Sequence, residues 1–379
     1  MPYPCGVATF TYDLATAAFP RQIVALHPPT GPDTYPAEVR HRIRRDVAED
    51  YPLVAEALDA SGVDIVSLQF AEAIWGGENG DYVLDLVRAL RLPVVTTLHD
   101  IPRQPTAGQA RVITALVRAS AATIVLSSPA AARLARTYGI APDRIEVVPH
   151  GVPDLPLVDP DTVKPRLALE GRRVILSFGL LDPGKGCEAV MEAMPAVVAE
   201  HPSALYVILG ATRPDVLARE GEAYREQLGA LARRLGVADQ VRFVDKFVGR
   251  VELATWLEAA DVVVTPYLDL DLASSGTLSY AMGAGKAIVS SPFAYARDRL
   301  TRRRGVLVAP GSAATLSAAL LQLLGDAKLR DSYARHAYDD SRDMTWSKVG
   351  SAYGRIFSRV KRPVALASAS SRRFAPAGR

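Results

Sequence analysis

Short apolar runs recur along this chain, and they show little alternation of apolar with polar residues. Such runs are typical of strands that are buried on both faces of a parallel sheet. Longer stretches with helical spacing separate them, and each would return the chain to the next parallel strand. In the first half, strands are predicted at residues 21–29, 63–70, 93–100, 122–127 and 144–151, and helices at 80–92, 108–120 and 129–139. Residues 36–61 are predicted as a helix or a loop followed by a helix.

The second half repeats this scheme. Strands are predicted at residues 172–181, 204–210, 240–248, 261–267 and 305–311, and helices at 187–201, 214–236, 251–260 and 313–325. A segment rich in proline and acid, residues 152–171, suits a linker between the halves. We therefore predict an α/β protein of two doubly wound domains that face each other across a cleft. In such sheets ligands bind outside the carboxyl ends of the strands.

At 379 residues the chain is too long for one ordinary core, which agrees with two domains. We place the N-terminal domain at residues 1–155 and the C-terminal domain at 156–345. No run of 18 apolar residues is present, and the N-terminus lacks the pattern of a secretory signal. The two cysteines, Cys5 and Cys187, have no metal-binding spacing and suit a reducing compartment. We expect a cytoplasmic protein.

The formal net charge of +3 comes from the end of the chain. The segment 359–379 holds six basic residues and no acidic one, so the rest of the chain is net negative. The tail, residues 361–379, is rich in Ser, Ala, Pro and Arg, and we predict that it is disordered. The charge therefore does not indicate a nucleic-acid partner, although the tail could contact an anionic membrane surface.

The chain begins with a glycine-containing turn, residues 4–9, followed by a helical stretch. In a β-α-β unit an apolar strand precedes such a turn, so we expect the first strand of this domain to lie upstream. Gly6 in this turn would let backbone N–H groups approach an anion across the cleft.

Four small residues, Ser274, Ser275, Gly276 and Thr277, lie between the predicted strand 261–267 and a short helical stretch. A helix start exposes free backbone N–H groups, and small side chains let a phosphate or diphosphate approach them closely. An ordinary N-cap of a buried helix would need only one of these residues. We therefore predict a phosphate site here, with a plain helix cap as the alternative.

Two further side chains follow strands at the same predicted edge. Lys185, in the stretch "FGLLDPGKG", could pair with a diphosphate as a point charge, or it could be a solvated turn lysine. His99 ends the strand "PVVTTLHD" and could donate a hydrogen bond into the cleft, or it could be a buried structural histidine. The pair Asp269 and Asp271 is more typical of a turn than of a metal site, and no metal ligand set is predicted.

Several stretches together resemble the retaining glycosyltransferases of family 4, which have the two-domain GT-B fold. The resemblance covers nearly all of residues 4–360 and rests on these stretches: "PCGVATF", "VVTTLHD", "VVPHGVPD", "FGLL…GKG", "DVVVTPY…SSGTLSYAMGAGKAIVSSP" and "TWSKVGSAYGRIF". It implies two facing Rossmann-like domains and a final helix, residues 346–360, that crosses back to the N-terminal domain.

The resemblance also implies a reaction. A hexose, such as mannose, would pass from a nucleoside-diphosphate sugar to a hydroxyl of a glycan or lipid-linked acceptor, with retention and without a cofactor or an essential metal. Lys185 and the amides of residues 274–277 would stabilise the leaving diphosphate. Gly6 would let backbone N–H groups contact the same phosphate from the other side of the cleft. His99 would hydrogen-bond to the donor sugar or the acceptor.

Three positions depart from the family pattern. Leu180 stands where the family has an arginine, and Leu272 and Tyr280 stand where it has a pair of glutamates, the second of which holds the ribose. Two alternatives therefore stay open at this point. One is a non-catalytic protein that binds a sugar nucleotide or glycan, and the other is a sugar phosphorylase of the same fold.

Overall fold

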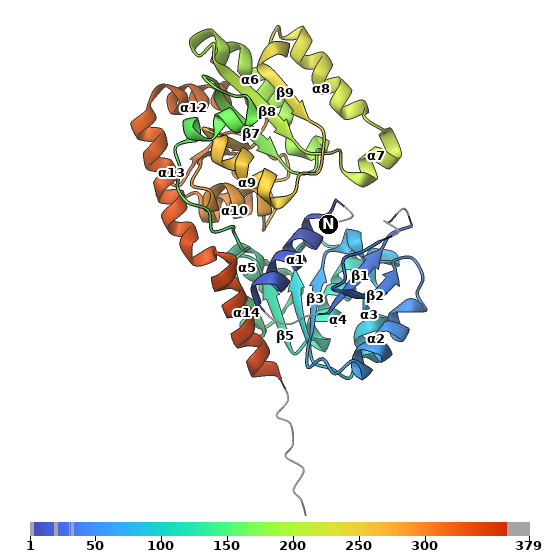
Figure 1. Cartoon of the computed structure of the whole chain (residues 1–379). Helices are drawn as coiled ribbons and strands as arrows, with labels where there is room; N and C mark the ends of the chain where they lie inside the picture. The colour runs from blue at the N-terminus through green and yellow to red at the C-terminus, as the bar shows by residue number, and fades with distance from the viewer. Residues whose placement is uncertain (1–3, 19–21, 30, 32–33, 362–379) are drawn as a thin grey trace, which may run out of the picture.

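The computed structural model describes residues 4–18, 22–29, 31 and 34–361. From residue 362 onward, the tail that we predict to be disordered lies outside the described residues. The described chain forms two α/β halves, one above the other in Figure 1, and the last helix runs along the lower one.

The first half contains two parallel sheets. The larger has the order β3 (Val66–Phe70), β4 (Val94–Leu98), β5 (Ala122–Val125), β6 (Ile145–Val147), and the smaller pairs β1 (Ile23–His27) with β2 (Val39–Arg44). The helices of this half are α1 (Gly6–Ala18), α2 (Asp50–Ala60), α3 (Val83–Ala89), α4 (Ala107–Ala119) and α5 (Ser128–Tyr138). Every residue of β4 is buried, which explains why its sequence lacks polar alternation.

The prediction for residues 36–61 is wrong in its first part. The helix α2 is present, but β2 precedes it and pairs with β1 in parallel. In β2 the half-buried or buried Val39, His41 and Ile43 alternate with exposed arginines. This period of two was present in the sequence and indicates a strand, but the charged residues concealed it.

The second half contains one six-stranded parallel sheet. Its order is β12 (Val306–Leu307), β11 (Ala287–Ser290), β10 (Val262–Thr265), β7 (Arg173–Phe178), β8 (Ala204–Leu209), β9 (Val241–Val244). Its helices are α6 (Cys187–Glu200), α7 (Pro214–Glu220), α8 (Ala223–Arg234), α9 (Arg250–Ala259), α10 (Gly276–Gly283), α11 (Ala294–Arg299), α12 (Ala313–Gly325) and α13 (Ala327–Ser341). The strand order reverses between β7 and β10, which is the switch point where doubly wound sheets bind ligands.

The single long helix predicted at residues 214–236 is also wrong. The chain breaks it into α7 and α8 at Gly221, whose φ of 60° lies in the left-handed region. A glycine adopts this conformation without the steric cost that other residues meet, so the helix ends there.

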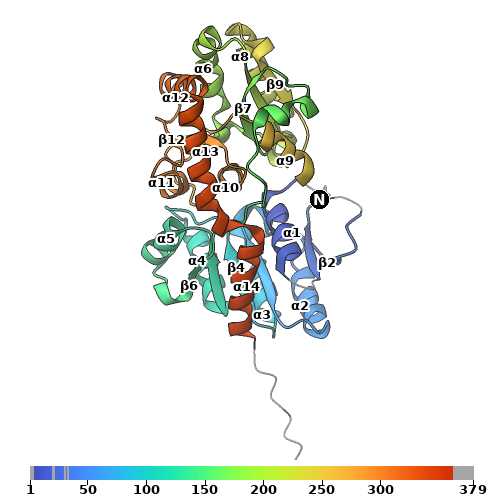
Figure 2. The same cartoon turned by 60° about the vertical axis from the view of Figure 1, so that its left-hand side comes forward.

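The last helix, α14 (Trp346–Val360), returns to the first half as predicted. It packs beside α1, where Val349, Tyr353 and Ile356 join Phe10 and Leu14 in one buried cluster. Figure 2 shows α13 along the second half and α14 continuing down the first. Within the described ranges, no helix is both long and apolar enough to traverse a bilayer.

Candidate functional site

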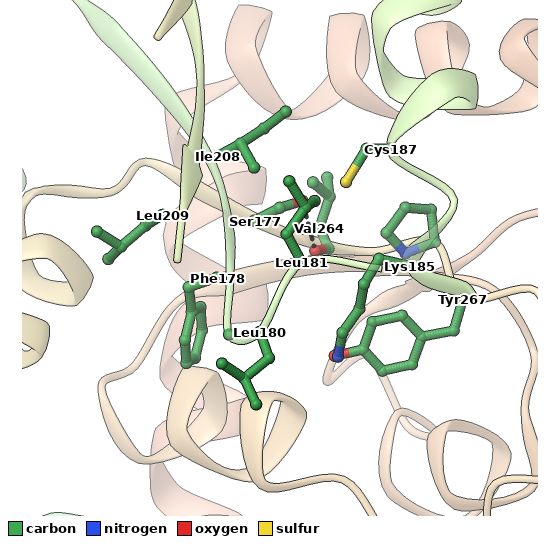
Figure 3. Close-up of a pocket in the computed structure, with 12 residues that line it drawn as sticks. Ser177, Phe178, Leu180, Leu181, Lys185, Cys187, Ile208, Leu209, Val264 and Tyr267 are labelled. Carbon is green, nitrogen blue, oxygen red and sulfur yellow. Dashed lines mark hydrogen bonds between the residues drawn. The ribbon is translucent and has the colours of Figure 1, made fainter. Parts of the chain in front are cut away.

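The loops that follow β7 and β10 meet at the switch point of the second sheet. The loop after β7 begins at Gly179, whose φ is 109°, and ends at Gly186, whose φ is 64°. A Cβ atom on Gly186 would lie 2.3 Å from the carbonyl oxygen of Pro266, which follows β10. Glycine therefore lets the two loops approach each other, and together they line a small pocket (Figure 3).

Lys185 lies in this pocket at the end of a short 3₁₀ helix, Pro183–Lys185, which Asp182 caps. Its ammonium donates to the Tyr267 hydroxyl at 3.3 Å and lies 4.3 Å from the centroid of that ring (Figure 3). Burial alone would lower the pKa of Lys185, but Tyr267 and Asp182 outweigh it and raise the pKa. The side chain is therefore a positive charge, and it is the only cation among the residues that line this pocket.

The start of α10 meets the same place from the other side. A Cβ atom on Gly179 would lie 3.4 Å from Thr277 Oγ1 and 3.9 Å from Lys185 Nζ. The structure thus brings together a glycine backbone and an ammonium from the loop after β7 and a hydroxyl from the start of α10. A tetrahedral oxyanion fits these donors, because glycine backbone, hydroxyl and ammonium groups all bind phosphate oxygens.

The four small residues at the start of α10, Ser274–Thr277, have different roles. Ser275 is the N-cap, since its side chain accepts from the Leu278 amide at 3.1 Å, and Ser274 donates to the His99 carbonyl oxygen at 3.0 Å. Because first-turn amides have no acceptor within a helix, the N–H groups of Gly276 and Thr277 have no partner inside α10. The simple cap is therefore present, and the amides of Gly276 and Thr277 and the Thr277 hydroxyl lie beside it.

His99 contacts the second half through its backbone, while its ring is held by Gln69. Its Nε2 lies 2.9 Å from Gln69 Oε1, and the Gln69 amide nitrogen donates to Ser67 Oγ at 3.2 Å. The amide orientation makes Nε2 the protonated nitrogen and leaves Nδ1 as an acceptor. Burial and the nearby His150 lower the pKa of His99 to about 3. The ring is therefore neutral and can accept a hydrogen bond from a hydroxyl through Nδ1.

Sequence reasoning gave no role to His150, which lies against the start of α10. A Cβ atom on Gly276 would be 2.9 Å from its Nε2, so any larger residue here would require the helix or the ring to shift. His150 Nδ1 bonds to the Gly151 carbonyl oxygen at 2.8 Å, and burial lowers the pKa of His150 to about 4. Its place near the end of the predicted strand 144–151, within the stretch "VVPHGVPD", was the signal available in the sequence.

Gly6 is the site residue that the structure does not join to the others. It is exposed at the start of α1, and a Cβ atom there would meet nothing within 4 Å. Among the described contacts none links Gly6 to Lys185 or Thr277, so its role in phosphate binding stays a prediction.

Comparisons with known proteins match each half of the chain to a glycosyltransferase family model. Residues 5–154 match the family described as "Glycosyltransferase Family 4", and residues 172–326 match "Glycosyl transferases group 1". The phosphatidyl-myo-inositol mannosyltransferase of Mycolicibacterium smegmatis is 32% identical over 249 residues, which cover 62% of this chain and 58% of that protein. A D-inositol 3-phosphate glycosyltransferase of Catenulispora acidiphila is 31% identical over 60% of this chain and 54% of that protein. The match thus spans little more than half the length of these relatives.

Solved structures resemble the whole fold. Sucrose-phosphate synthase from Thermosynechococcus elongatus superposes with a TM-score of 0.74 at 19% identity, covering 93% of this chain and 92% of that one. Anabaena HepE, solved with UDP and glucose, gives a TM-score of 0.75 at 15% identity over 95% and 97% of the two chains. At these identities the likeness concerns the fold alone, and it confirms two facing Rossmann-like domains in the GT-B arrangement.

Proposed function

The chain belongs to the group 1 glycosyltransferases of family 4, and from this premise we propose that it transfers a hexose from a nucleoside-diphosphate sugar to a hydroxyl of a glycan or lipid-linked acceptor, with retention. The observation that carries the proposal is the convergence of Lys185, Thr277 and the Gly179 backbone at the switch point. These groups suit a diphosphate.

The chemistry follows from where charge develops. When the bond between the anomeric carbon and the diphosphate oxygen breaks, its electron pair leaves with the diphosphate. Lys185 and the amides of Gly276 and Thr277 would stabilise that charge, because they are already oriented before the reaction. The acceptor oxygen forms the new bond on the same face, and its proton passes to a phosphate oxygen of the donor.

His99 would act on hydroxyls rather than on the phosphate. Its neutral ring offers Nδ1 as an acceptor, since Nε2 is already engaged with Gln69. A hydroxyl of the donor sugar or of the acceptor could donate to it, which would orient the reacting groups. Leu180, which also lines the pocket, brings no second charge, so Lys185 carries the cationic contribution in this proposal.

A thermal-shift panel followed by a transfer assay tests this function. The full chain is melted with UDP, GDP and ADP and with their sugars, because a ligand that binds only the folded state raises the melting temperature. The donor that stabilises most is then incubated with glycan and lipid-linked acceptors, with and without a chelator. We expect glycosylated acceptor in both cases and an α-linked product from an α-linked donor. Binding without any transfer would contradict catalysis, and dependence on free phosphate instead of a nucleotide would identify a phosphorylase.

The place of action is part of the same proposal. The basic tail, residues 361–379, would hold a cytoplasmic enzyme at the anionic inner face of a membrane, near a lipid-linked acceptor. Flotation with anionic and neutral vesicles checks this by comparing the full chain with a chain that ends at residue 361. Equal flotation of both chains would contradict a role for the tail.

A further inference from the structure

Asp13, on α1 in the first half, has both of its carboxylate oxygens bonded to the second half. Oδ1 accepts from Arg250 Nη1 at 2.7 Å, and Oδ2 accepts from the Tyr280 hydroxyl at 2.6 Å. The Asp13 side chain is only 2% exposed. A carboxylate so far from water is costly unless it is paired and hydrogen-bonded, and here both partners come from across the interface between the halves.

This burial excludes a direct role for Asp13 in binding substrate. Both of its oxygens are occupied and almost no surface is left for a ligand. Burial and the Asp13 carboxylate raise the pKa of Tyr280, so the phenol keeps its proton and donates it to the bond. Any effect of Asp13 on the candidate site must therefore pass through Arg250 or Tyr280.

Tyr280 lies on α10, four residues after Gly276. Residues four apart share one face of a helix, so the bond to Asp13 fixes how this face is turned toward α1. α10 is short, Gly276–Gly283, and its orientation at Tyr280 sets the direction of the amides at its start. Those amides, with Thr277 Oγ1, are the candidate phosphate donors.

The first half holds the start of α10 in two further places. Ser127 Oγ donates to the Ala273 carbonyl oxygen at 2.5 Å, and the His99 carbonyl oxygen accepts from Ser274 Oγ at 3.0 Å. Both contacts precede the helix, whereas Asp13 is bonded within it. The first half therefore contacts the residues just before α10, Ala273 and Ser274, and contacts the helix again at Tyr280.

We propose that Asp13 is a positioning residue, which turns α10 through Tyr280 so that the amides and Thr277 hydroxyl at its start face the Lys185 ammonium when the two halves are closed. The inference rests on the proposed function, because the site that it orients is the diphosphate site. It extends that function by making the first half part of the phosphate-binding machinery.

The test uses Asp13→Asn, Tyr280→Phe and the double variant in the full chain, titrated with UDP and with GDP by calorimetry. Loss of one hydrogen bond to a charged group changes a folding equilibrium by about 10-fold or more. We expect each single variant to weaken the binding of the nucleotide that wild type prefers by at least about fivefold. Because both variants weaken the bond between Asp13 and Tyr280, the double variant should bind nucleotide at most about twofold more weakly than the single variant with the lower affinity.

Tyr353→Phe is the matched control. Its buried hydroxyl bonds to Thr97 Oγ1 at 2.9 Å, so the variant loses a bond of the same kind within the first half and α14. We expect a similar loss of thermal stability without a change in nucleotide affinity. The proposal is overturned if both Asp13→Asn and Tyr280→Phe bind as wild type does, or if Tyr353→Phe weakens binding as much as they do.

A second measurement separates this inference from the proposed function. A double-mutant cycle in denaturant unfolding measures the coupling between Asp13 and Tyr280 without any nucleotide. If wild type binds no nucleoside diphosphate, the proposed function fails and so does the orienting role. Coupling in that cycle would then support only the contact between α1 and α10, whereas additive losses would overturn the contact itself.

Discussion

Lys185 illustrates at the residue scale how the fold builds a site from ordinary side chains. Its loop and α10 are far apart in sequence, yet Nζ and Thr277 Oγ1 both lie within 4 Å of one point beside Gly179. The sequence indicated both groups, since each follows a strand at the same sheet edge. It could not indicate the stacking of Lys185 on Tyr267 or the bonding of Ser274 to His99, because these depend on how separate loops and halves pack.

Replacing Lys185 by alanine tests the charge. We expect Lys185→Ala to lower turnover by about 10²–10³-fold, since removing one donor to a developing oxyanion costs roughly 2–4 kcal/mol. The melting temperature should change little. Lys246→Ala is the control, because that lysine is exposed and pairs with Glu252 on the same half. Unchanged turnover in Lys185→Ala would remove this residue from the mechanism.

The buried His150 and the half-buried His99 predict how stability depends on pH. The pKa of His99 is lowered to about 3 and that of His150 to about 4, so the folded state excludes protons that the unfolded state takes up near pH 6.5. Their contribution is fully present above pH 6.5 and is lost as pH falls toward 4. Each ring should cost about 1 kcal/mol of unfolding free energy at pH 5.5.

Denaturant unfolding between pH 7.5 and 5 checks this. His150→Gln should flatten the loss of stability on acidification, whereas replacement of the exposed His336 by glutamine should leave the wild-type slope. An identical slope in His150→Gln and wild type would show that this ring is not kept neutral by burial.

At the scale of elements, α10 is the part whose local sequence was most informative. Small residues after an apolar strand predicted a helix start with free amides, and Ser275 caps it as such a residue can. The errors at β2 and at the break between α7 and α8 have a different origin. At β2 the alternation of half-buried residues with arginines indicated a strand, but it lies directly before a helix. At the break, the single Gly221 interrupts a stretch that otherwise has helical spacing.

Gly276→Ala tests the first residue of α10. The added Cβ atom would lie 2.9 Å from His150 Nε2, so either the helix or the ring must shift, and overpacking of this kind costs about 1–3 kcal/mol. We expect weaker nucleoside-diphosphate binding and a lower melting temperature. Gly249→Ala is the matched control, because a Cβ atom before α9 meets nothing within 4 Å. Equal nucleotide affinity and melting temperature in the two variants would mean that the start of α10 accommodates a Cβ atom without a steric clash.

In the molecule as a whole, α14 returns to the first half and packs against α1, so the first and last helices of the described chain are in contact. The family resemblance predicted this helix and its destination. Its partners on α1 could not be read from the sequence, and neither could the pairing of Asp13 with Tyr280, because nothing local marks contacts between residues so distant in the chain. Such contacts depend on the docking of complete domains.

Tyr353→Ala tests what this return contributes. Tyr353 is fully buried beside Phe10 and bonds to Thr97, so the variant leaves a cavity between α14 and the first half. We expect a loss of about 3–5 kcal/mol in the free energy of unfolding, measured with denaturant. Arg355→Ala, on the exposed face of the same helix, should lose less than about 0.5 kcal/mol. A small loss in Tyr353→Ala would mean that α14 is dispensable for the first half.

The most direct test of the central claim is a crystal structure of the full chain with the nucleoside diphosphate that stabilises it most. The account predicts phosphate oxygens within about 3 Å of the Gly276 and Thr277 amides and of Lys185 Nζ. A nucleotide bound elsewhere, or a diphosphate that leaves these three donors in contact with solvent, would contradict it.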